Sequence, residues 1–488
     1  MKLINKITII VFVSLIIATG CDDYVDIGPK GTQDADNFFI SPEDYEQALT
    51  GAYDLLQTSY LSVWIGEIAS DNSLAGGESA TDTEGLHQID DMTHGGVNAE
   101  LRNIMRWNYA GITRANYIFE NKDNIDFEGK DEILAQAHFL RAYYYFELVK
   151  FFGDMPLILD RRIGIDEVST IPRTPATEIY AQIEADLQAA ADVLPWTNAT
   201  KGRVTKGSAL GLLGRVYTYQ KKYDEAATVL QTIIDAGIYS LFPDYTTMFY
   251  VENEGNEEVL FDIEYVGIEG GSYGCFVCLE GFAAPGFHGI RQYEGPFYGD
   301  GNSYNVPTAD LYNSFDPNDI RRDASVLDIV AWANSNDGVN YAEGYQHTGY
   351  FNNKYIKRAN ELGAPDNDLT SPLNHIIVRY ADVLLMAAEA NALKSSPDES
   401  LAQQYLNEVR DRVGLSPVSA SGSDLVDAIF NERRWEFAGE GLRFFDLLRS
   451  GDAEQEIEGF VVGKHELFPI PQVEIDLSGA GWPQNPNY

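Results

Sequence analysis

The chain has 488 residues, which is enough to bury a sizeable core in one large domain or a few smaller ones. It carries 75 acidic residues against 34 basic ones, and its formal charge of −41 excludes the Lys/Arg excess that binding to nucleic acid or to an anionic lipid surface requires. Aromatic residues make up 12% of the chain, with 29 tyrosines, and tyrosine suits surfaces that are half apolar and half hydrated.

The first 20 residues predict a cleaved export signal. Lys2 and Lys6 precede an apolar run over residues 7–17, which is shorter than the roughly 20 residues that a membrane-spanning helix needs. The run ends in "ATGC", which is similar to a bacterial lipobox, where the cysteine thiol receives the lipid. We therefore expect residues 1–20 to be removed and Cys21 to be lipidated. An ordinary signal with an incidental cysteine is the alternative.

Two acidic residues, Asp22 and Asp23, follow this cysteine. In bacterial lipoproteins that reach the cell exterior, acidic residues at this place often act as the export address, and these two resemble it. No later segment is apolar enough to cross a membrane, so we expect a mature chain that is tethered by its first residue.

Two further cysteines, Cys275 and Cys278, form the sequence "CFVC". A structural zinc site needs about four ligands, and the chain has no second cysteine pair. A local disulfide and a pair of half-buried thiols both remain open.

The N-terminal half is expected to be helical over residues 41–57, 100–120 and 130–154. Ser41 is a typical N-cap residue and Pro42 suits the first helical turn. The third segment carries one continuous apolar stripe, formed by Ile133, Ala137, Leu140, Tyr144 and Leu148.

Tetratricopeptide-like spacing recurs three times along the chain. In such helix pairs, small residues let two antiparallel helices approach closely while large residues fill the space between them. The three matches are Leu213, Gly214, Tyr217, Ala226 and Leu230; Ala390, Leu393, Ala402 and Leu406; and the half-copy Leu187, Ala190 and Pro195.

A change in composition divides the chain after about residue 240. "EEVLFDIEYV" alternates like a strand, and long loops rich in glycine and aromatic residues follow it. At the C-terminus, "ERRWEFAGEGLRFFDLLRSG" predicts a helix, a glycine-rich break and a second helix. The expected divisions are the signal (1–20), an N-terminal helical part (21–240), a loop-rich insertion with the ligand face (241–370) and a C-terminal helical pair with its tail (371–488).

Several of these segments together resemble the SusD/RagB family of outer-membrane lipoproteins. The resemblance is carried in order by "AQAHFLRAYYYFELVKFFGDMPLI", "YNVPTADLYNSFDPNDIRRD", "IIVRYADVLLMAAEANAL", "NERRWEFAGEGLRFFDLLRSG" and "LFPIPQVEIDLSGAGWPQNPNY". It implies a mostly α fold, in which a scaffold of tetratricopeptide-like helix pairs packs behind an irregular ligand-binding half with short strands. It also implies a SusC-like TonB-dependent transporter as partner, and an imported ligand that is usually an oligosaccharide and in one branch a peptide.

The sequence gives little support for catalysis. "GGSYG" at 270–274 matches a nucleophile pattern but lies in a glycine-rich loop rather than at a strand–turn–helix. His87, Asp90, Asp91 and His94 could bind a metal ion, although a solvated loop is the simpler interpretation. We therefore expect no enzyme activity, no cofactor and no metal site.

A sugar site needs aromatic faces for the C–H surfaces of the rings and planar polar groups for the hydroxyls. Trp107, Trp435, Trp196 and Trp482 are assigned to packing, which leaves Trp64 and Trp332 beside polar segments. The family places ligand aromatics in these two general regions, although no single residue can be aligned. The candidate ligand-binding residues are Trp64, Asp71, Asn72, Arg291, Tyr293, Phe297, Tyr298 and Trp332.

We therefore predict an outward-facing, lipid-anchored protein of the outer membrane that captures oligosaccharide or polysaccharide and delivers it to a TonB-dependent transporter. Peptide capture by the same architecture is the first alternative. A surface glycoside hydrolase and a purely structural lid on the transporter are the others. A few partly exposed aromatic rings predict a modest affinity, with a Kd of roughly µM to mM.

Overall fold

The computed structural model describes residues 38–267, 280–361 and 369–488. Cys21, the pair Cys275 and Cys278, and the segment 270–274 lie outside these ranges, so the predictions made for them stay predictions. Within the described ranges, no helix combines the length and the apolar character that crossing a bilayer would require.

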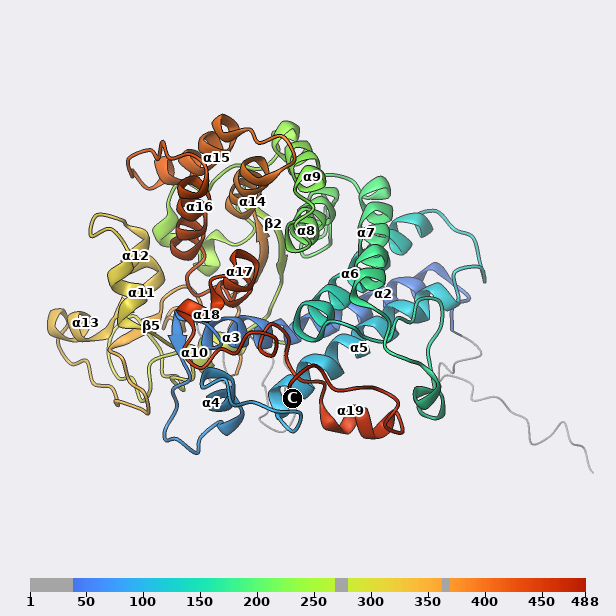
Figure 1. Ribbon diagram of the computed structural model, residues 1–488, viewed down its shortest axis with the longest axis horizontal. Helices are drawn as coiled ribbons and strands as arrows, with labels where there is room; N and C mark the ends of the chain where they lie inside the picture. Colours follow the sequence, from blue (N-terminus) through green and yellow to red (C-terminus); the bar gives the residue numbers. More distant parts are fainter. Residues whose placement is uncertain (1–37, 268–279, 362–368) are drawn as a thin grey trace, which may run out of the picture.

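Long helices form the scaffold, as the periodic apolar residues predict. In Figure 1, the helices α2, α5, α6 and α7 lie at the right of the molecule, and α8 and α9 lie near its top. These helices are α2 (Pro42–Asp54), α5 (Ala99–Glu120), α6 (Lys130–Phe152), α7 (Ala176–Val193), α8 (Lys206–Tyr219) and α9 (Tyr223–Ala236). The C-terminal helices are α14 (Tyr380–Leu393), α15 (Glu399–Arg412), α16 (Ser423–Glu436), α17 (Arg443–Ser450), α18 (Ala453–Glu456) and α19 (Gln472–Leu477).

Local signals in the sequence set the helix ends. The Ser41 side chain caps α2 by accepting from the backbone N–H of Asp44, and the Asp44 carboxylate accepts in turn from the N–H of Ser41 at 2.9 Å. The two C-terminal helices α16 and α17 are separated by the glycine-rich break that "FAGEGL" predicts.

The helix pairs approach as closely as the repeat spacing predicts. A side chain on Gly214 of α8 would place its Cβ 2.5 Å from a methyl carbon of Leu230 on α9, so glycine is required at this contact. In the second pair, Ala402 and Leu406 of α15 are fully buried. The repeat spacing also predicted that Leu393 fills the space between two helices. That prediction is wrong, because Leu393 is the last residue of α14 and is 38% exposed.

Short elements make up the rest of the described structure, mostly toward the left of Figure 1, with β2 at the centre beside α14 and α8. Its strands are β1 (Ser73–Leu74), β2 (Val259–Ile263), β3 (Val306–Pro307), β4 (Val326–Asp328), β5 (Tyr350–Asn352) and β6 (His375–Arg379), and they form the antiparallel pairs β1–β3, β2–β6 and β4–β5. Its helices are α3 (Tyr60–Ile68), α4 (Glu84–Asp90), α10 (Ala284–His288), α11 (Ala309–Ser314), α12 (Arg321–Ser325) and α13 (Ile329–Ser335).

The 3₁₀ helices η2 (Leu55–Ser59), η3 (Ile165–Thr170), η4 (Tyr245–Thr247) and η5 (Val251–Asn253) connect larger elements. One large apolar core joins the scaffold helices, and two smaller clusters of buried residues are separate from it; the one that lies beside the candidate site is called the small core here. The small core contains Ile290, Tyr293, Tyr298, Val306, Leu327, Ile329, Phe351 and Ile356.

Candidate functional site

Four of the predicted ligand-binding residues meet at the surface of the small core. Tyr293, Phe297 and Tyr298 come from the loop after α10, and Trp332 comes from α13. The ring centroids of Phe297 and Trp332 lie 5.9 Å apart with a 46° angle between the planes, and Tyr298 lies 5.1 Å from Trp332. We refer to these four residues as the aromatic patch.

The patch has an exposed layer and a buried layer. Phe297 is 39% exposed and Trp332 is half-buried, whereas Tyr293 and Tyr298 are each 6% exposed. The ring of Tyr298 meets the ring of Phe297 edge-on at 4.9 Å. Burial raises the pKa of both tyrosines above the ordinary value, so their hydroxyls stay protonated at neutral pH. Phe297 and Trp332 are therefore the rings that a ligand can reach.

Isolated β-bridges hold the loop that carries the patch. Glu294 pairs with Asn340, and Tyr298 pairs with Arg358. The hydroxyl of Tyr298 donates to Oδ1 of Asn353 at 3.2 Å. These contacts fix a loop that has no regular secondary structure of its own.

Polar and aromatic groups that the sequence did not single out border the patch. The ring of Tyr250 lies 6.4 Å from that of Phe297, and the guanidinium of Arg358 covers the Tyr250 ring at 4.1 Å. The bridge from Tyr298 to Arg358 and the hydrogen bond from Tyr298 to Asn353 join distant parts of the chain, so no local signal in the sequence could identify these two residues.

Arg291 is already engaged by protein groups. Its Nη2 lies 3.1 Å from a carboxylate oxygen of Glu78, and its Nη1 donates to the carbonyl of Asn302 at 3.1 Å. Its side chain is 14% exposed, while that of Glu78 is 76% exposed. A ligand would have to compete with these contacts, so a role for Arg291 as a polar clamp stays a prediction.

Trp64 does not offer a face to a ligand, which corrects the prediction for this residue. It lies inside α3 rather than before a loop, and it is 5% exposed. Its ring stacks on Phe287 at 4.9 Å and on Tyr304 at 5.6 Å, with angles of 24° and 19°. These two rings cover apolar surface of the Trp64 indole on which a sugar would have to stack. Trp64 is therefore a residue of the core.

Asn72 holds the fold together, contrary to the prediction that it binds ligand, and Asp71 is also engaged by protein groups, so its role in ligand binding stays a prediction. Nε of Arg443 binds one Asp71 oxygen at 2.7 Å, and Arg434 binds the other at 2.8 Å. Asn72 is fully buried, and its Oδ1 accepts from Nε of Arg434 at 2.9 Å. Both side chains are thus occupied by arginines that belong to the C-terminal helices.

A surface cavity of about 590 Å³ opens next to these ion pairs. Its lining includes six carboxylates, from Asp71, Asp90, Asp91, Asp310, Glu456 and Glu458. Burial, opposed by the N–H of Ala75 and reinforced by the charge of Asp91, raises the pKa of Asp90 to about 7. Asp90 therefore takes up a proton near neutral pH in the folded protein.

We expect Asp90→Asn to raise the melting temperature at pH 8 by a few degrees and to leave it unchanged near pH 4. The folded pKa of Asp90 lies above its unfolded value, so stability is lost as the pH rises toward 7, where wild type must bury a charge. Asparagine removes that charge. Thermal denaturation at both pH values checks this, with exposed Asp337→Asn as the control. An equal shift at both pH values would contradict it.

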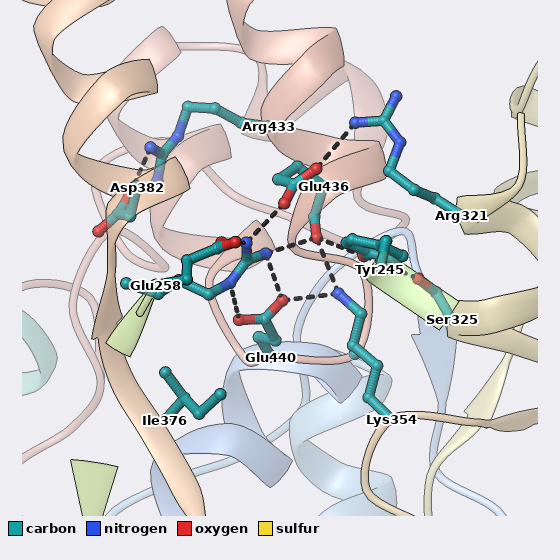
Figure 2. A network of polar contacts seen from close by, with 12 residues as sticks. Tyr245, Glu258, Arg321, Ser325, Lys354, Ile376, Asp382, Arg433, Glu436 and Glu440 are labelled. Atoms are coloured by element: carbon teal, nitrogen blue, oxygen red, sulfur yellow. Dashed lines mark hydrogen bonds and ion pairs between the residues drawn. The ribbon is translucent and has the colours of Figure 1, made fainter. Parts of the chain in front are cut away.

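The interior also contains many carboxylates, and Figure 2 shows a network that pairs them with basic groups. Arg379 binds Glu258 at 2.7 Å, Glu436 at 2.5 Å and Glu440 at 2.8 Å, and Lys354 binds Glu440 at 2.6 Å. Burial alone would raise the pKa of Glu436, but Arg412, Arg379 and Arg321 hold it well below its ordinary value. These carboxylates balance buried arginine charge instead of facing a cleft, where glycoside hydrolysis would need them.

The four residues considered for a metal site do not converge. His87 packs edge-on against Tyr345 at 5.0 Å, while Nε2 of His94 lies 2.9 Å from the hydroxyl of Tyr488. Across the three described ranges, no three His, Cys, Asp or Glu side chains are placed to hold a metal ion.

Comparison with known proteins now places the fold in a family. The model of the SusD family matches residues 239–466, and a model described as "Starch-binding associating with outer membrane" matches residues 23–218. SusD-like protein P2 of Formosa agariphila is 30% identical over 99% of both chains. The chain belongs to the SusD family.

Solved structures agree with this assignment. A laminarin-binding SusD-like protein is 32% identical, with a TM-score of 0.84, and the alignment covers 92% of this chain and 100% of that one. Surface glycan-binding protein A from Bacteroides thetaiotaomicron, solved in complex with laminarihexaose, has 26% identity and a TM-score of 0.83 over the same shares. The predicted family and the mostly helical SusD fold are thereby confirmed, and SusD family proteins are associated with the outer membrane.

Proposed function

We propose that this SusD family protein captures a glucan at the cell surface through the aromatic patch, and that the glucan is a β-1,3-linked one of the laminarin type. Binding without catalysis is part of this proposal. The names of the similar proteins supply the ligand class, because two of the structural relatives are described as binding laminarin or as complexed with laminarihexaose.

The observation that carries the proposal is the exposed pair Phe297 and Trp332. Their inclined planes present apolar surface in two directions, and pyranose rings can lay their C–H faces on such surfaces. Tyr250 and Asn353, which border the patch and are half-buried, can offer polar groups to the sugar hydroxyls. A shallow site of this kind gives a modest affinity, which suits a protein that must release its ligand to a partner.

The partner and the anchor complete the proposal. We expect Cys21 to carry the lipid that holds the protein on the outer membrane, facing outward. From there the glucan would pass to a SusC-like TonB-dependent transporter. Co-purification of that transporter with full-length protein, lost when Cys21 and the signal are removed, would support this arrangement.

We expect soluble protein that starts at Asp22 to be retarded by laminarin in affinity gel electrophoresis. Trp332→Ala and Phe297→Ala should each weaken the binding about tenfold, since each removes one stacking surface of roughly 1–2 kcal/mol. Trp196→Ala is the matched control, because Trp196 is a half-buried tryptophan on the scaffold. It should bind like wild type.

Other outcomes decide between the alternatives. Retardation by a different polysaccharide that is lost in the same variants would support the proposed site but would replace laminarin as the ligand. No retardation by any glycan in a panel would overturn the proposal, and binding from a peptide pool would then favour peptide capture. Release of reducing ends from laminarin by purified protein would favour a hydrolase.

A further inference from the structure

The two exposed rings of the aromatic patch are connected from behind through one hydroxyl group. Oη of Tyr293 accepts from Nε1 of Trp332 at 3.0 Å and donates to the carbonyl of Pro296 at 2.6 Å. Pro296 precedes Phe297, so one contact orients the indole of Trp332 and the other fixes the turn that presents Phe297. The Tyr293 ring itself is buried in the small core.

The turn needs such support because its backbone is strained. Phe297 has a φ of +75°, in the left-handed region, which costs a residue with a side chain about 1–2 kcal/mol. Strain of this kind persists only where surrounding contacts determine the conformation. The carbonyl of Phe297 accepts from the N–H of Ala359 at 2.7 Å, and the N–H of Tyr298 donates to Pro296 at 2.9 Å.

Space for the hydroxyl is provided by Gly295. A Cβ on this residue would lie 2.7 Å from Oη of Tyr293, which is closer than such atoms come in folded proteins. The Tyr293 hydroxyl is thus enclosed by Gly295, the carbonyl of Pro296 and the indole of Trp332.

We propose that the Tyr293 hydroxyl is a positioning group that preorganises Phe297 and Trp332 for the ligand without touching it. This inference rests on the proposed function of the patch. Rings that are fixed before binding lose less conformational freedom on binding, so the hydroxyl raises affinity through the two rings that it orients. A side chain with the same ring but no hydroxyl would fill the small core and leave both rings freer to move.

Tyr293→Phe tests the proposal because it removes the two hydrogen bonds and keeps the ring. We expect the Kd for laminarin to rise about three- to tenfold, the effect of losing roughly one net hydrogen bond. Tyr45→Phe is the matched control: Tyr45 is fully buried in the scaffold, and its hydroxyl donates to the Asn121 carbonyl at the same 2.6 Å. It should lose stability but no affinity.

A double-mutant cycle separates positioning from general loosening. In a Trp332→Phe background the indole donor is already absent, so Tyr293→Phe should cost clearly less affinity than it does in wild type. An equal loss in both backgrounds would overturn the proposal, because the hydroxyl would then act independently of Trp332. An unchanged Kd in the single variant would also overturn it and would leave the role of the patch intact.

A second measurement needs no ligand. Protein labelled with 5-fluorotryptophan should give six ¹⁹F resonances, and the one that disappears in Trp332→Phe belongs to Trp332. Tyr293→Phe should shift and narrow that resonance alone. If wild type binds no glycan, the proposed function fails, and this resonance still decides whether the hydroxyl orients Trp332: an unchanged resonance overturns the inference.

Discussion

Arg379→Ala is expected to lower the free energy of unfolding by about 3–5 kcal/mol, because it removes one partner of a buried ionic network. Arg379 is 1% exposed, and it neutralises three carboxylates that Figure 2 labels, those of Glu258, Glu436 and Glu440. Alanine would leave these carboxylates with fewer positive partners in a medium of low dielectric constant. Urea denaturation followed by circular dichroism measures the change.

The pH dependence identifies the cause of this loss. The pKa of Glu436 is depressed in the folded protein, so the stability it contributes is present above its unfolded pKa and is lost as the pH falls. Removing Arg379 takes part of that contribution away, and because the folded pKa lies well below 4.5, the deficit should be full at pH 8 and should shrink only at strongly acidic pH, near pH 2. Arg161→Ala removes a surface ion pair with Glu167 and should cost about 0–1 kcal/mol. A deficit of the same size at both pH values would point to lost packing instead of lost charge.

Gly66→Ala should destabilise the protein by about 2–4 kcal/mol, although alanine favours helix. Gly66 lies in α3, and a Cβ there would meet the carbonyl oxygen of Gly441 at 2.0 Å and its carbon at 2.8 Å. These are backbone atoms, so α3 itself would have to move away from the turn after α16. That movement would also break the bond from the N–H of Gly441 to Glu67 Oε1, which is 2.7 Å long.

Gly51→Ala supplies the control for Gly66→Ala. Gly51 lies in α2, and nothing approaches within 4 Å of the position that its Cβ would take. Alanine there should stabilise the protein by about 0.5–1 kcal/mol through helix propensity alone. Thermal melts of the two variants should thus move in opposite directions, and a small effect for both would contradict the tight contact between α3 and Gly441.

The scaffold could be predicted because its signals are local. Periodic apolar residues, the cap at Ser41 and the small residue Gly214 each act within a few turns of helix, and each has the predicted role. Within the patch, the aromatic residues of "RQYEGPFYGDG" and Trp332 were each predicted from their own surroundings. Their meeting depends on the bridge between Glu294 and Asn340, which periodicity does not encode.

The errors at Trp64 and Asn72, and the ion pairs of Asp71 that the sequence did not reveal, have one physical cause. Polar residues after Trp64 resemble a solvated loop, but Glu67 lies in α3 and is buried, and several of these side chains have partners from elsewhere in the chain. Glu67 accepts from Gly441, and Asp71 and Asn72 bind arginines of the C-terminal helices. Since those partners lie at the far end of the sequence, buried and solvated polar residues look alike in the local pattern.

The three small sheets in the described part of the chain have a consequence for how the chain folds. Two of them join segments that are far apart in the sequence: Ser73 pairs with Pro307, and Val259 pairs with Arg379. Contacts between distant segments form slowly because a long loop must close first, whereas α5 to α9 can pair with sequence neighbours. During synthesis the N-terminal part of the chain appears first, so the helical scaffold would form early. The loop-rich half, together with the charges around Arg379, would become ordered only after the residues near 440 arrive, so this half should be the last region to gain protection from proteases.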